Sequence, residues 1–121
     1  MVDHNLKFIS INSLDDAKRE IKKIGSDPKS ISIMAPKAIL RIIKLENIVL
    51  QDAIIIKQDM LSIGGEVAVP KYTFELNEKT GDILVIGTIK QLHDLVDKLN
   101  RHYPRLKNIA QELDNLLKDI K

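Results

Sequence analysis

The spacing of the apolar side chains constrains the fold of this chain more than any other feature. Stretches in which apolar residues recur every three or four positions are typical of helices that bury one face. Such stretches cover residues 13–25, 49–63, 89–99 and 106–120. Ser13 is suited to cap the first of them and Gly25 to end it. Pro104 separates the last two, because the residue before a proline avoids the helical conformation.

Short runs rich in apolar and β-branched residues lie between these stretches and predict strands. We expect extended segments at residues 6–11, 30–34, 38–45, 66–69, 71–76 and 82–87. Residues 38–45 and 82–87 are nearly continuous in apolar side chains, which is typical of strands covered on both faces. Turn residues before 82–87 favour a hairpin with the segment that precedes it. The order βαββαββαα predicts an α+β fold with helices packed on a mixed sheet, whose strand order stays open.

The size of the chain is that of one domain, and we expect residues 1–121 to form a single α+β domain. Hydrophobic residues make up 44% of it and charged residues 30%, which are values typical of a globular protein. There is no cysteine, which excludes disulfides and thiolate metal ligands. No window approaches the ~18 unbroken apolar residues that span a bilayer, and no leader-like pattern opens the sequence. We therefore expect a cytoplasmic protein without membrane contact.

The charges argue against a nucleic-acid partner. The chain has 19 basic and 17 acidic residues, well mixed along the sequence, for a net charge of +2. Nucleic-acid binding usually needs a concentrated basic face, and single-strand binders add stacking aromatic side chains. The aromatic residues here are few, namely Phe8, Phe74, Tyr72 and Tyr103. We expect no nucleic-acid binding.

One candidate ligand site lies at Gly87–Thr88, where a predicted strand meets a predicted helix. Free backbone N–H groups and the positive end of the helix dipole could bind an anion there, with Lys90 or Lys57 adding positive charge. A single glycine is not a phosphate-binding loop, however, and Thr88 is also explained as the N-cap of the helix. Gly64–Gly65 could likewise be an approach point for a ligand, but the end of a helix is the favoured interpretation.

The sequence contains no recognisable catalytic or metal-binding set. His93 and Asp97 are four residues apart and share a helix face, which could supply two metal ligands or a base with its orienting carboxylate. His102 falls on the opposite face, and without a third ligand a solvated helix surface is favoured. None of the serines has the Gly-x-Ser-x-Gly pattern. We predict no metal, no cofactor and no enzymatic activity.

Several segments together resemble a known family, at residues 33–38, 41–45, 57–70 and 84–91. They resemble the extra N-terminal region found ahead of the barrel in some prokaryotic dihydropteroate synthases, enzymes of folate-type pterin biosynthesis. The most specific piece is Lys-Gln-Asp-Met-Leu-Ser-Ile-Gly-Gly-Glu, residues 57–66, followed by Gly-Thr-x-x-Gln at 87–91. The match would cover roughly residues 24–117. The chain departs from the family pattern at Ile54, where asparagine is usual, and at 102–105, where His-Tyr-Pro-Arg replaces a Gln-Pro-Phe-Gly-like turn.

What this resemblance implies about activity is limited. The pterin and aminobenzoate sites of the family belong to a (β/α)₈ barrel of ~250 residues, which does not fit in this chain. We therefore expect a non-catalytic accessory or interaction module, linked to pterin/folate-type biosynthesis through a protein partner. The alternative is a small-molecule or anion-binding protein that uses the helix start at Gly87, Thr88 and Lys90. An enzyme would require His93, Asp97 and another titratable group to converge in one pocket.

Overall fold

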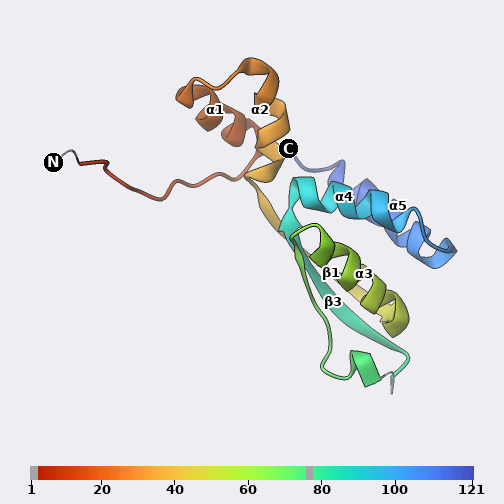
Figure 1. Ribbon diagram of the computed structural model, residues 1–121. Coiled ribbons are helices and arrows are strands. Elements are labelled where there is room, and N and C mark those ends of the chain that lie inside the picture. The colour runs from red at the N-terminus through yellow and green to blue at the C-terminus, as the bar shows by residue number, and fades with distance from the viewer. Residues whose placement is uncertain (1–2, 76–77) are drawn as a thin grey trace.

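The computed structural model describes residues 3–75 and 78–121. Its elements are α1 (Leu14–Ile24), α2 (Pro28–Met34), the 3-10 turn η1 (Ala35–Lys37), β1 (Leu40–Val49), α3 (Leu50–Ser62), β2 (Glu66–Ala68), the 3-10 turn η2 (Thr73–Glu75), β3 (Thr80–Thr88), α4 (Ile89–Leu99) and α5 (Pro104–Leu117). Figure 1 shows α3, α4 and α5 grouped around the sheet, with α1 and α2 at the end where β1 begins. The prediction of an α+β fold with helices packed on a sheet is confirmed.

The sheet has the strand order β1-β3-β2, and both of its pairings are antiparallel. Leu40 lies opposite Thr88, and a bulge interrupts the register between Leu45 and Ile48. The prediction of a mixed sheet is therefore wrong. Strands β1 and β2 do run in the same direction, but β3 returns between them and pairs with both, so that no two neighbours are parallel.

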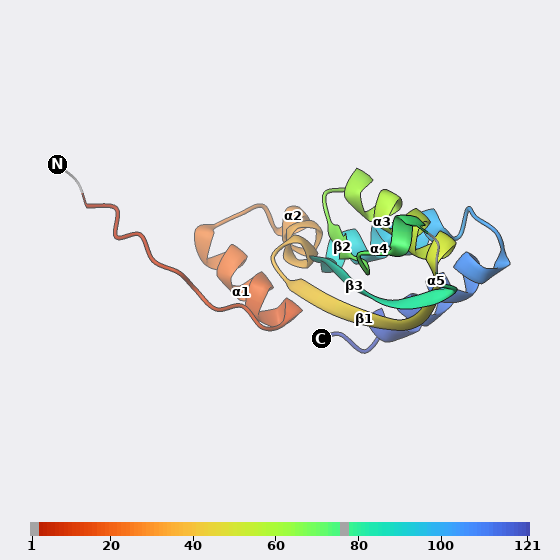
Figure 2. The same cartoon turned by 90° about the horizontal axis from the view of Figure 1, so that it is seen from below.

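Helices cover one face of the sheet and leave the other open. Figure 2 shows α3 and α4 on the same side of β1 and β3. On the covered side Ile83 and Val85 are buried, whereas Leu40 and Ile42 on the opposite side are 56% and 58% exposed. The prediction that 38–45 and 82–87 are covered on both faces is wrong, because the helices pack on one face only. On the other face apolar side chains such as Leu84 stay exposed, alongside charged ones such as Lys44 and Asp82.

Two groups of buried apolar residues form the interior. The larger group joins the covered side of the sheet to α3, α4 and α5, with Met60, Leu92 and Leu106 fully buried. The smaller group includes Ala17 and Ile39 and fixes α1 and η1 against the start of α4. Ile120 packs against both groups and so connects them.

Residues 6–11 do not form the predicted strand. They run as an extended arm away from the rest of the molecule, as Figures 1 and 2 show, and Phe8 is 105% exposed. Their alternation of apolar and polar residues does favour a strand, but a strand needs a neighbour to pair with, and the arm has none among the strands of the described chain.

Residues 30–34 are helical, so the strand predicted there is also wrong. The Asp27 side chain accepts a hydrogen bond from Lys29 N, at 2.9 Å, and Pro28 occupies the first position of α2. These are the signals of a helix N-terminus, which share their residues with a turn.

Residues 71–75 form a turn and the short helix η2 in place of the predicted strand, and Leu76 lies outside the described residues. The Thr73 hydroxyl donates to Pro70 O at 2.7 Å, and this local bond stabilises the turn. The hairpin predicted between this segment and 82–87 is therefore wrong, and β3 instead pairs antiparallel with β2, residues 66–68, across a longer connection. The four predicted helices correspond to α1, α3, α4 and α5. Within the described residues, no helix is both long and apolar enough to cross a membrane.

Candidate functional site

The predicted ligand site lies at the start of α4, where β3 ends. The Thr88 hydroxyl accepts from Gln91 N at 3.1 Å, while Gln91 Oε1 accepts from Thr88 N at 2.9 Å. This reciprocal pair is a capping box, so Thr88 is the N-cap, as one of the two interpretations predicted. Ile89 N donates to Ile39 O at 2.9 Å. Several N–H groups that would bind an anion thus already have partners in the protein.

Gly64–Gly65 and Gly87 let the end of α3 approach the start of α4 closely. A Cβ atom at Gly65 would lie 2.5 Å from Met60 Cε and 3.0 Å from Ile86 O, and one at Gly87 would also collide with Met60 Cε. Gly64 has a φ of 91°, in the left-handed region, as expected after the end of a helix. The Gln91 amide donates to Ile63 O at 3.3 Å and joins the two helix ends.

Lys57 connects α3 to the first residues of β2. Its ammonium group donates to Val67 O at 2.7 Å and to Glu66 Oε1 at 3.1 Å. Glu66 also accepts from Val67 N at 2.8 Å. The Val67 N–H and then Lys57 hold the pKa of Glu66 below its usual range, so this carboxylate stays charged.

These contacts bring the most specific pieces of the family resemblance together in space. We call the region the α3–α4 corner and define it by Lys57, Gly64, Gly65, Glu66, Gly87, Thr88 and Gln91. Beside it is an open depression of about 430 Å³ lined by Lys37, Ile63, Thr88, Lys90, Gln91 and Asp94. The Lys90 ammonium pairs with Asp94 at 2.5 Å. The predicted residues Gly87, Thr88 and Lys90 thus lie together, at the corner and its rim.

A second polar cluster, which sequence reasoning missed, lies where the turn between α4 and α5 meets α3. Asp52 lies in the first turn of α3 and is only 1% exposed, although it carries a carboxylate. It accepts hydrogen bonds from the Tyr103 hydroxyl and from Arg105 Nε and Nη2, the latter two at 2.9 and 3.0 Å. The guanidinium group lies 4.9 Å from the centre of the Tyr103 ring. The arrangement neutralises a buried carboxylate.

The pKa values of this cluster follow from that geometry. Burial favours a raised pKa for Asp52, but the hydrogen bonds from Arg105 and Tyr103 outweigh it and the net pKa is lowered. Burial and the neighbouring carboxylate raise the pKa of Tyr103, and Asp52 raises that of Arg105. All three groups therefore keep one protonation state around neutral pH, which suits a structural role better than acid–base catalysis.

The histidines lie apart from any metal-binding arrangement in the described residues. His93 and Asp97 are both exposed on α4. His102 lies in the turn between α4 and α5 and not on the predicted opposite face of the helix. Its Nε2 is 2.9 Å from Asp59 Oδ2 of α3. Within residues 3–75 and 78–121, no three histidine, aspartate or glutamate residues are placed to hold a metal ion.

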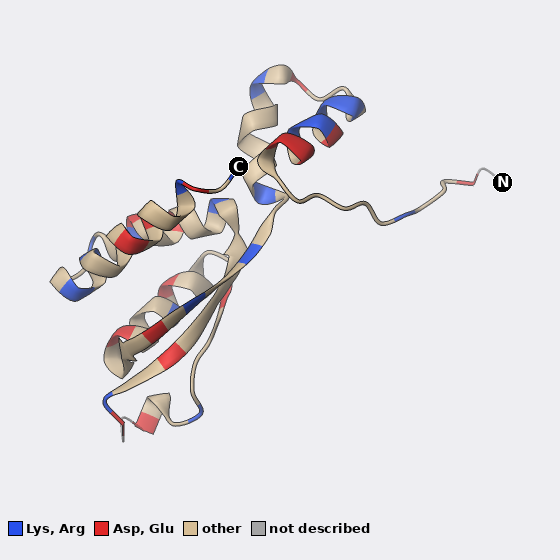
Figure 3. Ribbon diagram, turned by 180° about the vertical axis from the view of Figure 1, so that it is seen from behind, with Lys and Arg blue, Asp and Glu red and all other residues tan. Residues whose placement is uncertain are grey.

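The charges are as well mixed in space as in sequence. Figure 3 shows basic and acidic residues interspersed along α1, the sheet and α5. The predicted absence of nucleic-acid binding remains a prediction.

The chain is a small α+β domain, and it is similar to parts of proteins that contain dihydropteroate synthase. One such protein is the bifunctional dihydropteroate synthase/dihydropteroate reductase of Helicobacter pylori, 31% identical over 104 residues, which are 86% of this chain and 27% of that protein. Another is a probable bifunctional folylpolyglutamate synthase/dihydropteroate synthase of Halobacterium salinarum, 27% identical over 106 residues, which are 85% of this chain and 12% of that protein. The resemblance seen in the sequence is thereby confirmed, over a small part of each relative's length. No family model and no solved structure matches the chain.

Proposed function

We propose that this chain is a non-catalytic accessory module of pterin/folate-type biosynthesis that acts through a protein partner, with the α3–α4 corner as its contact surface. The observation that carries the proposal is the coincidence of two features. The segments 57–66 and 87–91 carry the most specific part of the resemblance, and they meet at one accessible corner of the fold.

The partner suggested by the comparisons is a dihydropteroate synthase. In both relatives the segment that resembles this chain belongs to the same polypeptide as a synthase. We infer that the same type of domain here contacts a synthase as well. Lys37 and Lys90, at the rim of the corner, would favour an acidic patch on the partner.

Calorimetric titration of this chain with purified dihydropteroate synthase from the same organism tests the proposal. We expect saturable binding, weakened about tenfold or more by Lys90→Glu, because a charge reversal at the rim opposes an acidic partner. Glutamate in the first turn of α4 is favourable for the helix, so the variant should fold. The control is Lys107→Glu on the exposed side of α5, which should bind like wild type. Absence of binding, or equal loss in both variants, contradicts the proposal.

A second candidate function is favoured by the size and name of the Helicobacter protein. Its 104 matched residues are 27% of its length, so about 280 residues lie outside the match, close to the ~250 of a (β/α)₈ barrel. If that remainder is the synthase, the dihydropteroate reductase activity in its name involves the segment similar to this chain. A reductase role for this chain is the candidate that follows.

An activity assay separates the two candidates. The chain is incubated with dihydropteroate and a hydride donor, either a reduced nicotinamide or a reduced flavin, and oxidation of the donor is followed. The accessory role predicts no rate above that of the chain-free control. A rate that Lys57→Met abolishes and Lys107→Glu leaves intact would replace the accessory role with the reductase role.

A further inference from the structure

The arm, residues 3–12, exposes a segment that is suited to form a strand. Leu6 is 90% exposed and Phe8 105%, although both are large apolar side chains. Leu6, Phe8 and Ser10 alternate with Lys7, Ile9 and Ile11, so an extended arm presents Leu6 and Phe8 on one side. Exposure of such a segment to water is unfavourable unless something covers it.

Strand β1 offers an unoccupied edge of matching length. It is ten residues long and, among the described strands, pairs with β3 along one side only. Long exposed edges are usually protected, since their free N–H and C=O groups pair readily with another strand. This edge therefore has room for one further strand.

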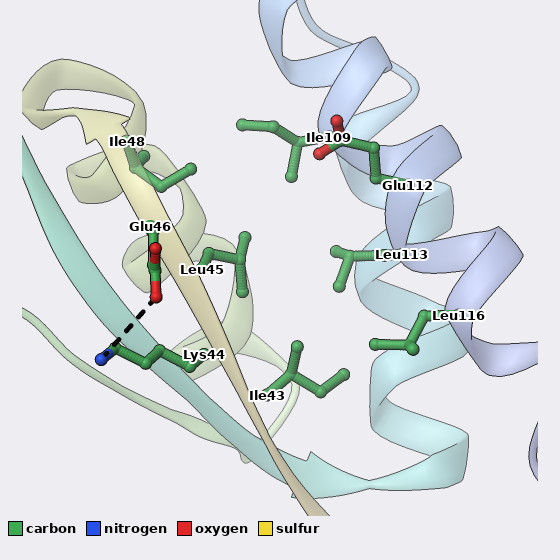
Figure 4. Close-up of a pocket in the computed structure, with 9 residues that line it drawn as sticks. All are labelled: Ile43, Lys44, Leu45, Glu46, Ile48, Ile109, Glu112, Leu113 and Leu116. Carbon is green, nitrogen blue, oxygen red and sulfur yellow. Dashed lines mark ion pairs between the residues drawn. The ribbon is translucent and has the colours of Figure 1, made fainter.

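An apolar groove of about 230 Å³ runs between this edge and α5. Figure 4 shows Ile43 and Leu45 of β1 directed towards Leu113 and Leu116 of α5, while Lys44 and Glu46 lie on the other side of the strand. Leu116 remains 47% exposed. A strand added beside β1 would lie next to α5 and place every second side chain in this groove.

We propose that the arm of a second copy of this chain adds to the free edge of β1, so that two copies exchange arms and each completes the other's sheet. A twofold dimer satisfies both arms and both edges at once. The exchange adds main-chain hydrogen bonds along β1 and inserts Phe8 between β1 and α5.

The chain's own arm is held in a direction that leads away from its β1. Asn12 N donates to Asp16 Oδ2 at 3.3 Å, and Asn12 O accepts from Arg41 Nη2 at 2.9 Å. Ile11 packs against the smaller core group. With Ile11 and Asn12 fixed, residues 3–10 project outward, as Figure 2 shows, and are available to another copy.

Side-chain complementarity fixes the register. In an antiparallel pairing with Phe8 opposite Leu45, Phe8 enters the groove and Lys7 lies opposite Glu46. The apolar side of the arm then faces α5, and its lysine meets a carboxylate on the open face of the sheet. A shift by one residue would turn Phe8 out of the groove.

Disulfide trapping tests this arrangement directly, because the chain has no cysteine of its own. Residues opposite each other in an antiparallel pair have Cα atoms about 4.5–5.5 Å apart, within disulfide range. The double variant Phe8→Cys/Leu45→Cys is oxidised in full-length protein and run on a non-reducing gel. We expect most of it to migrate at twice the 13.7 kDa chain mass.

The single variants and an off-register pair are the controls. Phe8→Cys alone, Leu45→Cys alone and Ile9→Cys/Leu45→Cys should remain mainly monomeric on the gel. An internal disulfide at monomer mobility would show that each arm covers its own edge, and a covalent dimer from Leu45→Cys alone would show that two β1 edges meet. Either result, or no disulfide in the double variant, overturns the exchange.

Light scattering on the native protein gives a second readout. Wild type should have the mass of a dimer, and Leu6→Ser/Phe8→Ser that of a monomer with an unchanged circular dichroism spectrum, since both side chains are exposed in a single copy. A monomeric wild type, or a dimer that survives the double substitution, contradicts the proposal.

Discussion

Asp52 shows how a single residue can depart from the pattern around it. A buried carboxylate is rarely found without hydrogen-bond partners. Here the partners are the Tyr103 hydroxyl and the Arg105 guanidinium group, which come from a distant part of the sequence. The helical spacing did indicate that Asp52 is buried, because it lies four residues before the buried Ile56 and three after Val49, on the inward side of α3. What the sequence could not show is that 102–105, where the chain departs from the family pattern, lies against this helix.

The pH dependence of stability tests the role of Asp52. Its pKa in the folded chain is below the ordinary 3.8, so folding favours the charged form. The stabilisation is complete above about pH 5 and is lost as the pH falls through the lowered pKa. Asp52→Asn should lower the free energy of unfolding by about 1–3 kcal/mol at pH 7. The difference from wild type should shrink below pH 4 in urea titrations.

The exposed Asp97→Asn serves as the control and should change stability little at either pH. If Asp52→Asn lowers the free energy of unfolding by the same amount at every pH down to pH 2, the charged form of Asp52 is not what stabilises the fold.

Gly87 is expected to tolerate a side chain poorly, because a Cβ atom there would collide with buried Met60. Gly87→Ala should cost about 1–3 kcal/mol of unfolding free energy, the usual cost of overpacking. In Met60→Ala, where room has been made, the same change should cost clearly less. Equal costs in both backgrounds, measured by chemical denaturation, would show that the two residues do not compete for space.

At the scale of elements, helices were easier to predict than strands. The regular stripes of α1, α3, α4 and α5 are intrinsic to each segment, since a helix makes its own hydrogen bonds. Strands depend on a neighbour, which is why the strand-like segment 6–11 lies unpaired while 66–68 pairs with β3. Residues 30–34 were mispredicted for a different reason, because Asp27 and Pro28, which precede them, are typical of turns as well as of helix starts.

The capping box of α4 makes a prediction for that element. Thr88→Ala removes the acceptor for Gln91 N and should lower stability by about 1 kcal/mol, whereas Thr88→Ser keeps the hydroxyl and most of the stability. Thermal unfolding of the two variants compares them. Equal melting temperatures for Ala and Ser would show that the hydroxyl contributes nothing.

At the scale of the whole molecule, two core groups are connected through Ile120. The prediction of a single domain, residues 1–121, implies that they unfold together. Calorimetry should give one transition with equal calorimetric and van't Hoff enthalpies. Two transitions in wild type would assign α1 and α2 to a separate unit.

The local roles of several residues in the candidate site were predictable from the sequence, whereas the contacts that bring these residues together were not. Thr88 as an N-cap and Gly64–Gly65 as a helix end follow from local chemistry. The contact of Gln91 with Ile63 O and that of Lys57 with Val67 O join segments distant in sequence, so they required the fold.

We propose that the α3–α4 corner is the surface through which this chain meets a dihydropteroate synthase. The most direct test is to follow the backbone amide resonances of the isotopically labelled chain as unlabelled synthase from the same organism is added. We predict that the largest shifts or losses of signal fall at residues 57–66 and 86–91. A spectrum that does not change, or changes confined to the Asp52 cluster or the β1 edge, would contradict the claim.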